Sequence, residues 1–388
     1  MKALRNFLDR LKPNFEEGGK FGMFRSVFDG FETFMFTPNT TSKSGAHIHD
    51  SIDSKRTMTV VIIALVPALL FGMYNTGYQH NLATGIDPGF VMTFIYGFLA
   101  VLPKIVVSYL VGLGIEFVVA QWKKEEIQEG FLVSGILIPM IVPIDTPLWM
   151  IAVATAFAVV FAKEVFGGTG YNIFNVALVT RAFLFFAYPA AMSGDKVFVR
   201  TDTTFGIGGE KIVDAFSGAT PLGQIGTAAK ESIGSFQAVD ILGAPLTTWD
   251  YFIGLIPGSI GETSVLAILL GAAILIVTKI ASWKTMMSVF VGGMATAALF
   301  NLVGTTVVMT VSPIDHLFLG GFAFGAVFMA TDPVTSARTE TGKYIYGFLV
   351  GAFAIIIRAL NPGYPEGMML AILLMNTDRK STRLHSSH

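Results

Sequence analysis

The stretch VDAFSGATPLGQ contains a threonine, Thr220, that could carry a bulky group. Ser217, Gly218 and Ala219 come just before it, and their small side chains leave its hydroxyl accessible. Asp214 is close enough in sequence to help hold a metal-bound phosphate during an attachment reaction. A Ser-Gly-Ala-Thr sequence on its own is typical of a turn. The residues therefore leave two roles open, a turn and an attachment site.

Two carboxylates lie in or beside apolar runs, and they are candidates for cation transport. Glu116 lies within one run, and Asp332 ends another in VFMATDPVTSA. A carboxylate inside a membrane is costly and is usually functional, and its hard oxygen atoms suit a small cation such as Na+. Asp332 could also cap a helix that begins at Pro333. Both roles for Asp332 stay open.

The segment KKEEIQEGF precedes another apolar run and is a candidate pocket edge. Its acidic residues, Glu129 among them, are favoured at a helix N-terminus by the helix dipole. Gly130 leaves space at the membrane boundary.

Several other polar residues lie in apolar surroundings, and we expect most of them to have structural roles. Lys163 and Glu164 are expected to pair with each other. Arg181 and Arg358 resemble buried cations that need partners. His316 has no matching ligand set and is expected to be hydrogen-bonded within the fold or exposed.

Composition predicts an integral membrane protein. The 388 residues are 53% hydrophobic and 14% charged, and mean hydropathy is +0.63, whereas soluble domains carry about 25% charge. The net charge of −1 provides no basic surface for nucleic acid. Cysteine is absent, which excludes disulfides and iron–sulfur ligation within the chain. A redox cofactor held here would be organic.

The elements that must position these residues are apolar helices. We predict an all-α polytopic membrane fold in which the third and eighth segments are short or broken helices. The ten predicted segments are 58–77, 92–119, 130–143, 149–166, 174–191, 264–281, 284–304, 317–331, 344–360 and 366 onward.

Lysine and arginine gather on alternate loops, which predicts that the N-terminus is cytoplasmic. The predicted organisation is a cytoplasmic amphipathic segment, two membrane halves of five spans, an outer polar insertion and a tail. The two membrane halves resemble each other weakly. No cleavable signal peptide is expected. The tail is abruptly polar and is interpreted as non-native. The amphipathic segment is 1–57, the membrane halves are 58–191 and 264–375, the outer insertion is 192–263, and the tail is 376–388.

Motifs along most of the chain resemble one family of membrane redox subunits. They are AKEVFGGTGYNIFNVALVTRAFLFFAYPAAMSGD, IPGSIGETSVLAILLGA, GGFAFGAVFMATDPV and NPGYPEGMMLAIL, together with DAFSGATPLGQ and the amphipathic N-terminus. The family comprises the B-type subunit of the Na+-translocating NADH:quinone oxidoreductase and the D-type subunit of the Rnf complex. The long N-terminal extension favours the B-type subunit.

The resemblance implies FMN esterified through its phosphate to Thr220, a non-covalent riboflavin, ubiquinone as substrate and coupled Na+ movement. It places Gly130 and Glu129 beside the quinone and Asp332 on the sodium path. Glu116, inside the second predicted span, is the runner-up for the ion path. A flavin transferase and partner subunits that carry NADH, FAD and iron–sulfur sites are implied, in a bacterial inner membrane. The family's acidic residue after the last span has no match here, since Asp378 does not correspond to it.

From the residues alone, a passive solute channel and a structural scaffold remain alternatives. Ten spans and broken helices suit a channel equally well. Thr220 with its small neighbours favours the redox subunit over a channel, and Asp332 and Glu116 argue against a scaffold.

Overall fold

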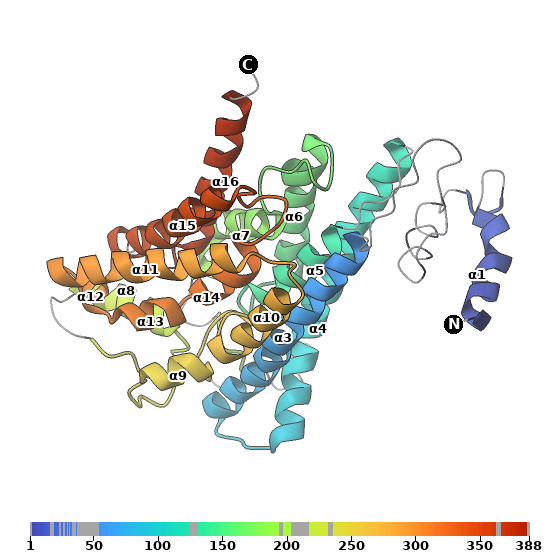
Figure 1. Ribbon diagram of the computed structural model, residues 1–388. Helices are drawn as coiled ribbons and strands as arrows, with labels where there is room; N and C mark the ends of the chain where they lie inside the picture. Colours follow the sequence, from blue (N-terminus) through green and yellow to red (C-terminus); the bar gives the residue numbers. More distant parts are fainter. Residues whose placement is uncertain are drawn as a thin grey trace.

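The computed structural model describes residues 2–15, 54–123, 130–193, 197–202, 217–231, 236–361 and 366–385, with a few single residues and a short stretch between 19 and 36. Within these residues the regular elements are helices, apart from isolated bridge residues such as the antiparallel pair Val239 and Pro245. The prediction of an all-helical, multi-pass membrane protein is confirmed (Figure 1).

Five long helices are apolar enough to cross a bilayer. A helix rises about 1.5 Å per residue, so about 20 residues span the hydrocarbon core, and the shortest of the five has 19. They correspond to predicted segments 1, 2, 4, 7 and 9. They are α3 (Ser54–Thr84), α4 (Phe90–Lys123), α6 (Leu148–Ala158) with its continuation to Phe166, α11 (Trp283–Val303) and α15 (Glu340–Leu360).

Four further apolar helices are too short to cross alone. The predicted segments 174–191 and 264–281 were too long. The first ends early because Pro189 follows it, and the second ends where Lys279 takes a left-handed φ of 58°. The four are α5 (Phe131–Met140), α7 (Val176–Ala187), α10 (Val265–Val277) and the apolar part of α16 (Met368–His385).

The predicted segment 317–331 is a broken helix, as expected. It consists of the end of α13 (Pro313–Phe318), α14 (Phe322–Phe324) and a π-helical turn, η5 (Gly325–Met329). The break falls at Gly320 and Gly321, whose φ values of 63° and 69° suit glycine. Broken backbone is tolerated in a membrane where protein buries it.

The short and broken helices form the centre of the bundle. Ile138 and Met140 of α5 and Phe324 and Ala326 beside η5 are fully buried. Around them, α3 packs on α4 and α10, and α11 packs along α15. Small residues allow these close approaches, which are typical of membrane helix pairs. A Cβ at Gly351 would lie 2.0 Å from the carbonyl oxygen of Val289.

A second apolar cluster lies beside the main core and anchors the segment that contains Thr220. Leu222 and Ile225 of α8 (Pro221–Glu231) pack with Ile256, with Leu319 and with Val307 of α12 (Val307–Thr310). Thr220 therefore lies at the start of a helix that is docked on the bundle. The neighbouring helix α9 (Thr248–Ile253) begins with a capping box.

Gln224 fixes the position of α8. Its side-chain amide donates to the Val239 carbonyl (2.8 Å) and its carbonyl oxygen accepts from the Val239 amide (2.9 Å). This anchor was not predicted, although Gln224 belongs to the DAFSGATPLGQ motif.

The predicted N-terminal segment contains α1 (Lys2–Phe15), which Figure 1 draws apart from the packed helices. The rings of Phe15 and Phe28 stack at 4.7 Å between centroids. At the other end, the boundary expected at residue 376 falls inside α16. Asn376 is buried and accepts a hydrogen bond from the Tyr346 hydroxyl (2.9 Å).

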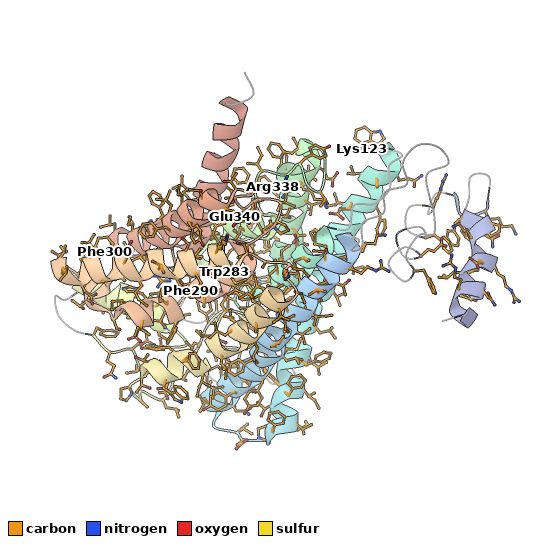
Figure 2. The ribbon with its side chains drawn as sticks, in the orientation of Figure 1. Lys123, Trp283, Phe290, Phe300, Arg338 and Glu340 are labelled. Carbon is orange, nitrogen blue, oxygen red and sulfur yellow. The ribbon has the colours of Figure 1, made fainter. Side chains whose placement is uncertain are left out.

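Charged side chains gather where α11 and α15 meet. Figure 2 shows Trp283 and Glu340 at the same end of this helix pair and Phe300 at the other. Glu340 accepts from Lys343 (2.7 Å) and also pairs with Lys284. This basic end of the bundle is the one predicted to face the cytoplasm.

Candidate functional site

Thr220 lies on the rim of a pocket with about 390 Å³ of empty space, which we call the Thr220 pocket. Its walls come from Thr220–Leu222, the loop from Ile256 to Thr263, the chain from Phe318 to Gly321, and Glu366.

Thr220 caps α8, so it has a structural role in addition to the proposed chemical one. Its Oγ1 accepts a hydrogen bond from the Gly223 amide (3.0 Å), and its carbonyl oxygen accepts from Gln224 (2.9 Å). Pro221 occupies the first helical position, where proline is favoured. The hydroxyl therefore lies at a helix N-terminus, where free amides and the dipole favour a phosphate.

The residues from Ser217 to Ala219 have no regular secondary structure. Ser217 is exposed, Gly218 is buried, and Ala219 is half-buried. The Ala219 carbonyl accepts from the Gln224 side chain (3.2 Å). Asp214 lies outside the described residues, so its proposed role stays a prediction.

Arg181 pairs with two of the carboxylates that line the Thr220 pocket. It lies on α7, and its guanidinium donates to Glu262 from both terminal nitrogens and to Glu366 from one of them. The Arg181 and Glu262 side chains are only 7% and 6% exposed. Glu366 lies in the connection before α16, outside the helices. Burial raises the pKa of its carboxyl, and the Arg181 guanidinium opposes that shift.

Arg358 is the other arginine that we expected to be buried, and it donates to backbone carbonyls. It donates to the carbonyl oxygens of His316 (2.6 Å), Leu319 (3.0 Å) and Glu366 (3.3 Å). The His316 ring lies 3.0 Å from the Val308 carbonyl oxygen, so the prediction of a satisfied histidine is confirmed.

Three residues of the Thr220 pocket were not singled out from sequence. Glu262 and Ser259 belong to IPGSIGETS, and Glu366 belongs to NPGYPEG. Both motifs were noted without a role for their polar residues. The sequence did offer one indication of them, because Arg181 was predicted to be a buried cation that needs partners.

A second cavity, with about 800 Å³ of empty space, lies near the start of α3, and we call it the Asp332 cavity. Gly130 and Asp332 both line it, together with Thr57, Lys163 and Asn175. Two residues that were predicted for different ligands therefore share one site. Glu129 lies outside the described residues.

Asp332 caps a turn and contacts the other half of the chain. Its Oδ1 accepts from the Val334 amide (3.0 Å), and its Oδ2 accepts from the Thr335 hydroxyl (3.0 Å) and the Asn175 side-chain amide (3.2 Å). Residues 333–336 form a turn and not a helix. The alternative role, a cap for a helix starting at Pro333, was wrong because the chain turns back here and α15 begins only at Glu340.

Glu116 is buried at the edge of this region. Its carboxylate pairs with Lys163, which lines the Asp332 cavity, and its Oε2 has no hydrogen-bond partner in the described part of the chain. The expected Lys163–Glu164 pair was wrong, since Glu164 pairs with Lys123 (3.6 Å). The residue adjacent in sequence points elsewhere because the chain changes from a π-helical to a 3₁₀ turn between the two.

The two sites are far apart along α3, but they come close to each other along α7. Thr57 and Asn75 of α3 are 18 residues apart, about 27 Å, and Asn75 donates to the Ile256 carbonyl in the loop of the Thr220 pocket (2.9 Å). On α7, Asn175 reaches Asp332, and Arg181 reaches Glu262 only six residues, about 9 Å, further on.

Comparison with known proteins matches residues 41–378 to a model of the NQR2, RnfD, RnfE family. A protein of Chromohalobacter salexigens is 43% identical over 96% of this chain and 92% of its own length. One of Azotobacter vinelandii is 42% identical, over 96% and 94%. One of Stutzerimonas stutzeri is 41% identical with the same coverage. Each is named as the B-type subunit of a Na(+)-translocating NADH-quinone reductase.

Proposed function

The chain belongs to the NQR2, RnfD, RnfE family, and we propose from that premise that it is the B-type membrane subunit of a Na+-translocating NADH-quinone reductase. Such a subunit passes electrons to ubiquinone while Na+ crosses the membrane. Its near full-length similarity to three proteins of that name supports this subunit over the Rnf type, over a channel and over a scaffold.

The first cofactor in this proposal is FMN, joined to Thr220 as a phosphate ester. The observation that carries it is the Thr220 hydroxyl at the N-terminus of α8, on the rim of a pocket. The amides at the start of α8 would hold the phosphate. The small residues Ser217, Gly218 and Ala219 give a flavin transferase access, and Asp214 assists it. The test is flavin fluorescence that survives denaturation of the chain and is lost with Thr220.

FMN supplies electron transfer when it is bound, and the protein provides position and electrostatics. Leu222 and Ile225 hold α8 on the bundle, so the attachment point stays fixed relative to the pocket. Arg181 keeps the Glu262 and Glu366 carboxylates in place beneath it. The Arg358 guanidinium holds the Leu319 carbonyl at the pocket wall (3.0 Å).

We assign the second redox site, for the quinone or the non-covalent riboflavin, to the Asp332 cavity, which Gly130, Asp332 and Asn175 line. Gly130 keeps the entrance open, and Asp332 with Asn175 presents polar groups inside it. Na+ moves close to this cavity, with Asp332 and, as the runner-up, Glu116 as oxygen ligands. This arrangement places the proposed redox group and the proposed ion path beside the same carboxylate.

The proposed topology has ten crossings in two related halves. The four short helices and the broken α13–η5 segment complete the five long spans. The basic end of the bundle faces the cytoplasm of a bacterial inner membrane, and residues 192–263 lie outside. Partner subunits supply the sites for NADH, FAD and iron–sulfur clusters. The clusters need cysteine ligands, and this chain has no cysteine.

We expect Gly130→Ala to raise the KM for quinone by roughly threefold to tenfold, equivalent to about 1 kcal/mol of lost contact. A Cβ at Gly130 would lie 2.5 Å from Cγ2 of Thr169 at the cavity rim. Steady-state quinone reduction by the assembled complex measures the effect. Gly114→Ala is the matched control, since nothing lies within 4 Å of a Cβ there. Equal KM values for the two variants would refute a role for Gly130 at the quinone site.

We expect Asp332→Asn to raise the Na+ concentration that gives half-maximal quinone reduction by about tenfold, because a bond to a charged group is worth about 1.5–3 kcal/mol. The amide keeps the shape of the side chain and removes its charge. Asp87→Asn is the control, since Asp87 accepts from the amide two residues on in the same way but is exposed and lines neither pocket (3.0 Å to Gly89). An unchanged Na+ dependence in Asp332→Asn would remove this residue from the ion path.

A further inference from the structure

One hydroxyl in the Thr220 pocket has no partner among the described residues. Ser259 is 3% exposed, lines the pocket, and its Oγ makes no hydrogen bond within that part of the chain. Leaving a buried polar group unsatisfied costs about 1–3 kcal/mol. Ser259 lines the Thr220 pocket, so a group bound in that pocket would lie next to this buried hydroxyl.

The loop that carries Ser259 is held rigidly on both sides. Asn75 of α3 donates to the Ile256 carbonyl (2.9 Å) and to Thr263 (3.4 Å). The Gly261 amide donates to the Met140 carbonyl of α5 (2.7 Å). The Ser259 hydroxyl is thus fixed before a ligand arrives, which reduces the entropy cost of binding.

The pocket offers both kinds of hydrogen-bonding group. Ser259 supplies a donor, and the Glu262 and Glu366 carboxylates supply acceptors. Gly321 keeps the wall close, since a Cβ there would lie 2.6 Å from a Glu262 oxygen. This set complements a flat heteroaromatic ring whose edge carries carbonyl and nitrogen acceptors beside an N–H group, which describes the ring of a flavin.

We propose that Ser259 donates a hydrogen bond to the acceptor edge of the flavin ring attached at Thr220, and that it raises the reduction potential of that flavin. This inference rests on the proposed attachment. Reduction adds negative charge to the ring, so a fixed donor is bound more strongly by the reduced form than by the oxidised form. Ser259 is a ligand of the cofactor and takes no proton or electron itself.

The test is a redox titration of the covalent flavin in the purified complex that carries Ser259→Ala. At the potential where the unmodified protein is half reduced, we expect the ratio of oxidised to reduced flavin to rise about threefold to tenfold. Fluorescence of the denatured chain should stay unchanged, because attachment does not need this hydroxyl.

Ser264→Ala is the matched control. Ser264 is a buried serine on the same loop, but its Oγ caps the Ala267 amide (3.3 Å) and does not line the pocket. It should leave the ratio unchanged. An unaltered potential in Ser259→Ala, with the flavin attached, overturns the inference alone. The absence of covalent flavin from the unmodified chain overturns the attachment itself.

Discussion

Thr220→Val is expected to abolish covalent flavin fluorescence and reduce quinone reduction by the complex to background. Valine has nearly the shape of threonine but has no oxygen that can form a phosphate ester. It also removes the cap of α8, which costs about 1 kcal/mol. The apolar anchors Leu222 and Ile225 remain, so the chain should still insert and assemble. In-gel fluorescence under ultraviolet light and quinone reduction by purified complex measure the two effects.

Ser217→Ala is the control for this experiment, because Ser217 is an exposed hydroxyl in the same motif. It should keep full fluorescence. Thr220→Asn keeps a side-chain oxygen that can cap α8 but has no hydroxyl to esterify, so it separates loss of the cap from loss of the attachment site. If fluorescence persists in Thr220→Val and disappears in Ser217→Ala, our proposal assigns the flavin to the wrong residue.

Arg181→Met is expected to destabilise the folded protein by about 3–5 kcal/mol, because it leaves two carboxylates buried without their cation. Glu262 is almost fully buried and Glu366 largely so. Methionine fills part of the volume without the charge. The melting temperature of the purified complex in detergent reports the loss, and we expect the largest fall of any single substitution proposed here.

Two variants show whether charge is the cause. Arg181→Met combined with Glu262→Gln and Glu366→Gln removes both carboxylates and should recover part of the stability. Lys343→Met breaks an exposed pair with Glu340 (2.7 Å) and should leave the melting temperature nearly unchanged. If Arg181→Met and Lys343→Met melt at the same temperature, the buried network does not contribute as we infer.

The membrane character and the long helices could be predicted from the sequence because they depend on local composition. About twenty apolar residues in a row specify a span whatever surrounds them. The ends of α7 and α10 were less predictable, since a turn at Tyr188 and a left-handed Lys279 end apolar runs that could have continued.

The pairing of buried charges could not be predicted, because it depends on which helices meet. Arg181 finds its partners 81 and 185 residues away. Lys163 forms its ion pair with Glu116 on α4 and not with its neighbour Glu164. The convergence of Gly130 and Asp332 on one cavity depends in the same way on the packing of α5 against the second half.

The most direct test of the account is the mass of the peptide that contains Thr220. Trypsin cleaves after Lys211 and Lys230, which releases residues 212–230. From protein produced with the flavin transferase, we predict a peptide heavier by one FMN less one water, with fragmentation that places the added mass on Thr220. An unmodified peptide under those conditions, or the added mass on Ser217 or Thr227, would contradict the account.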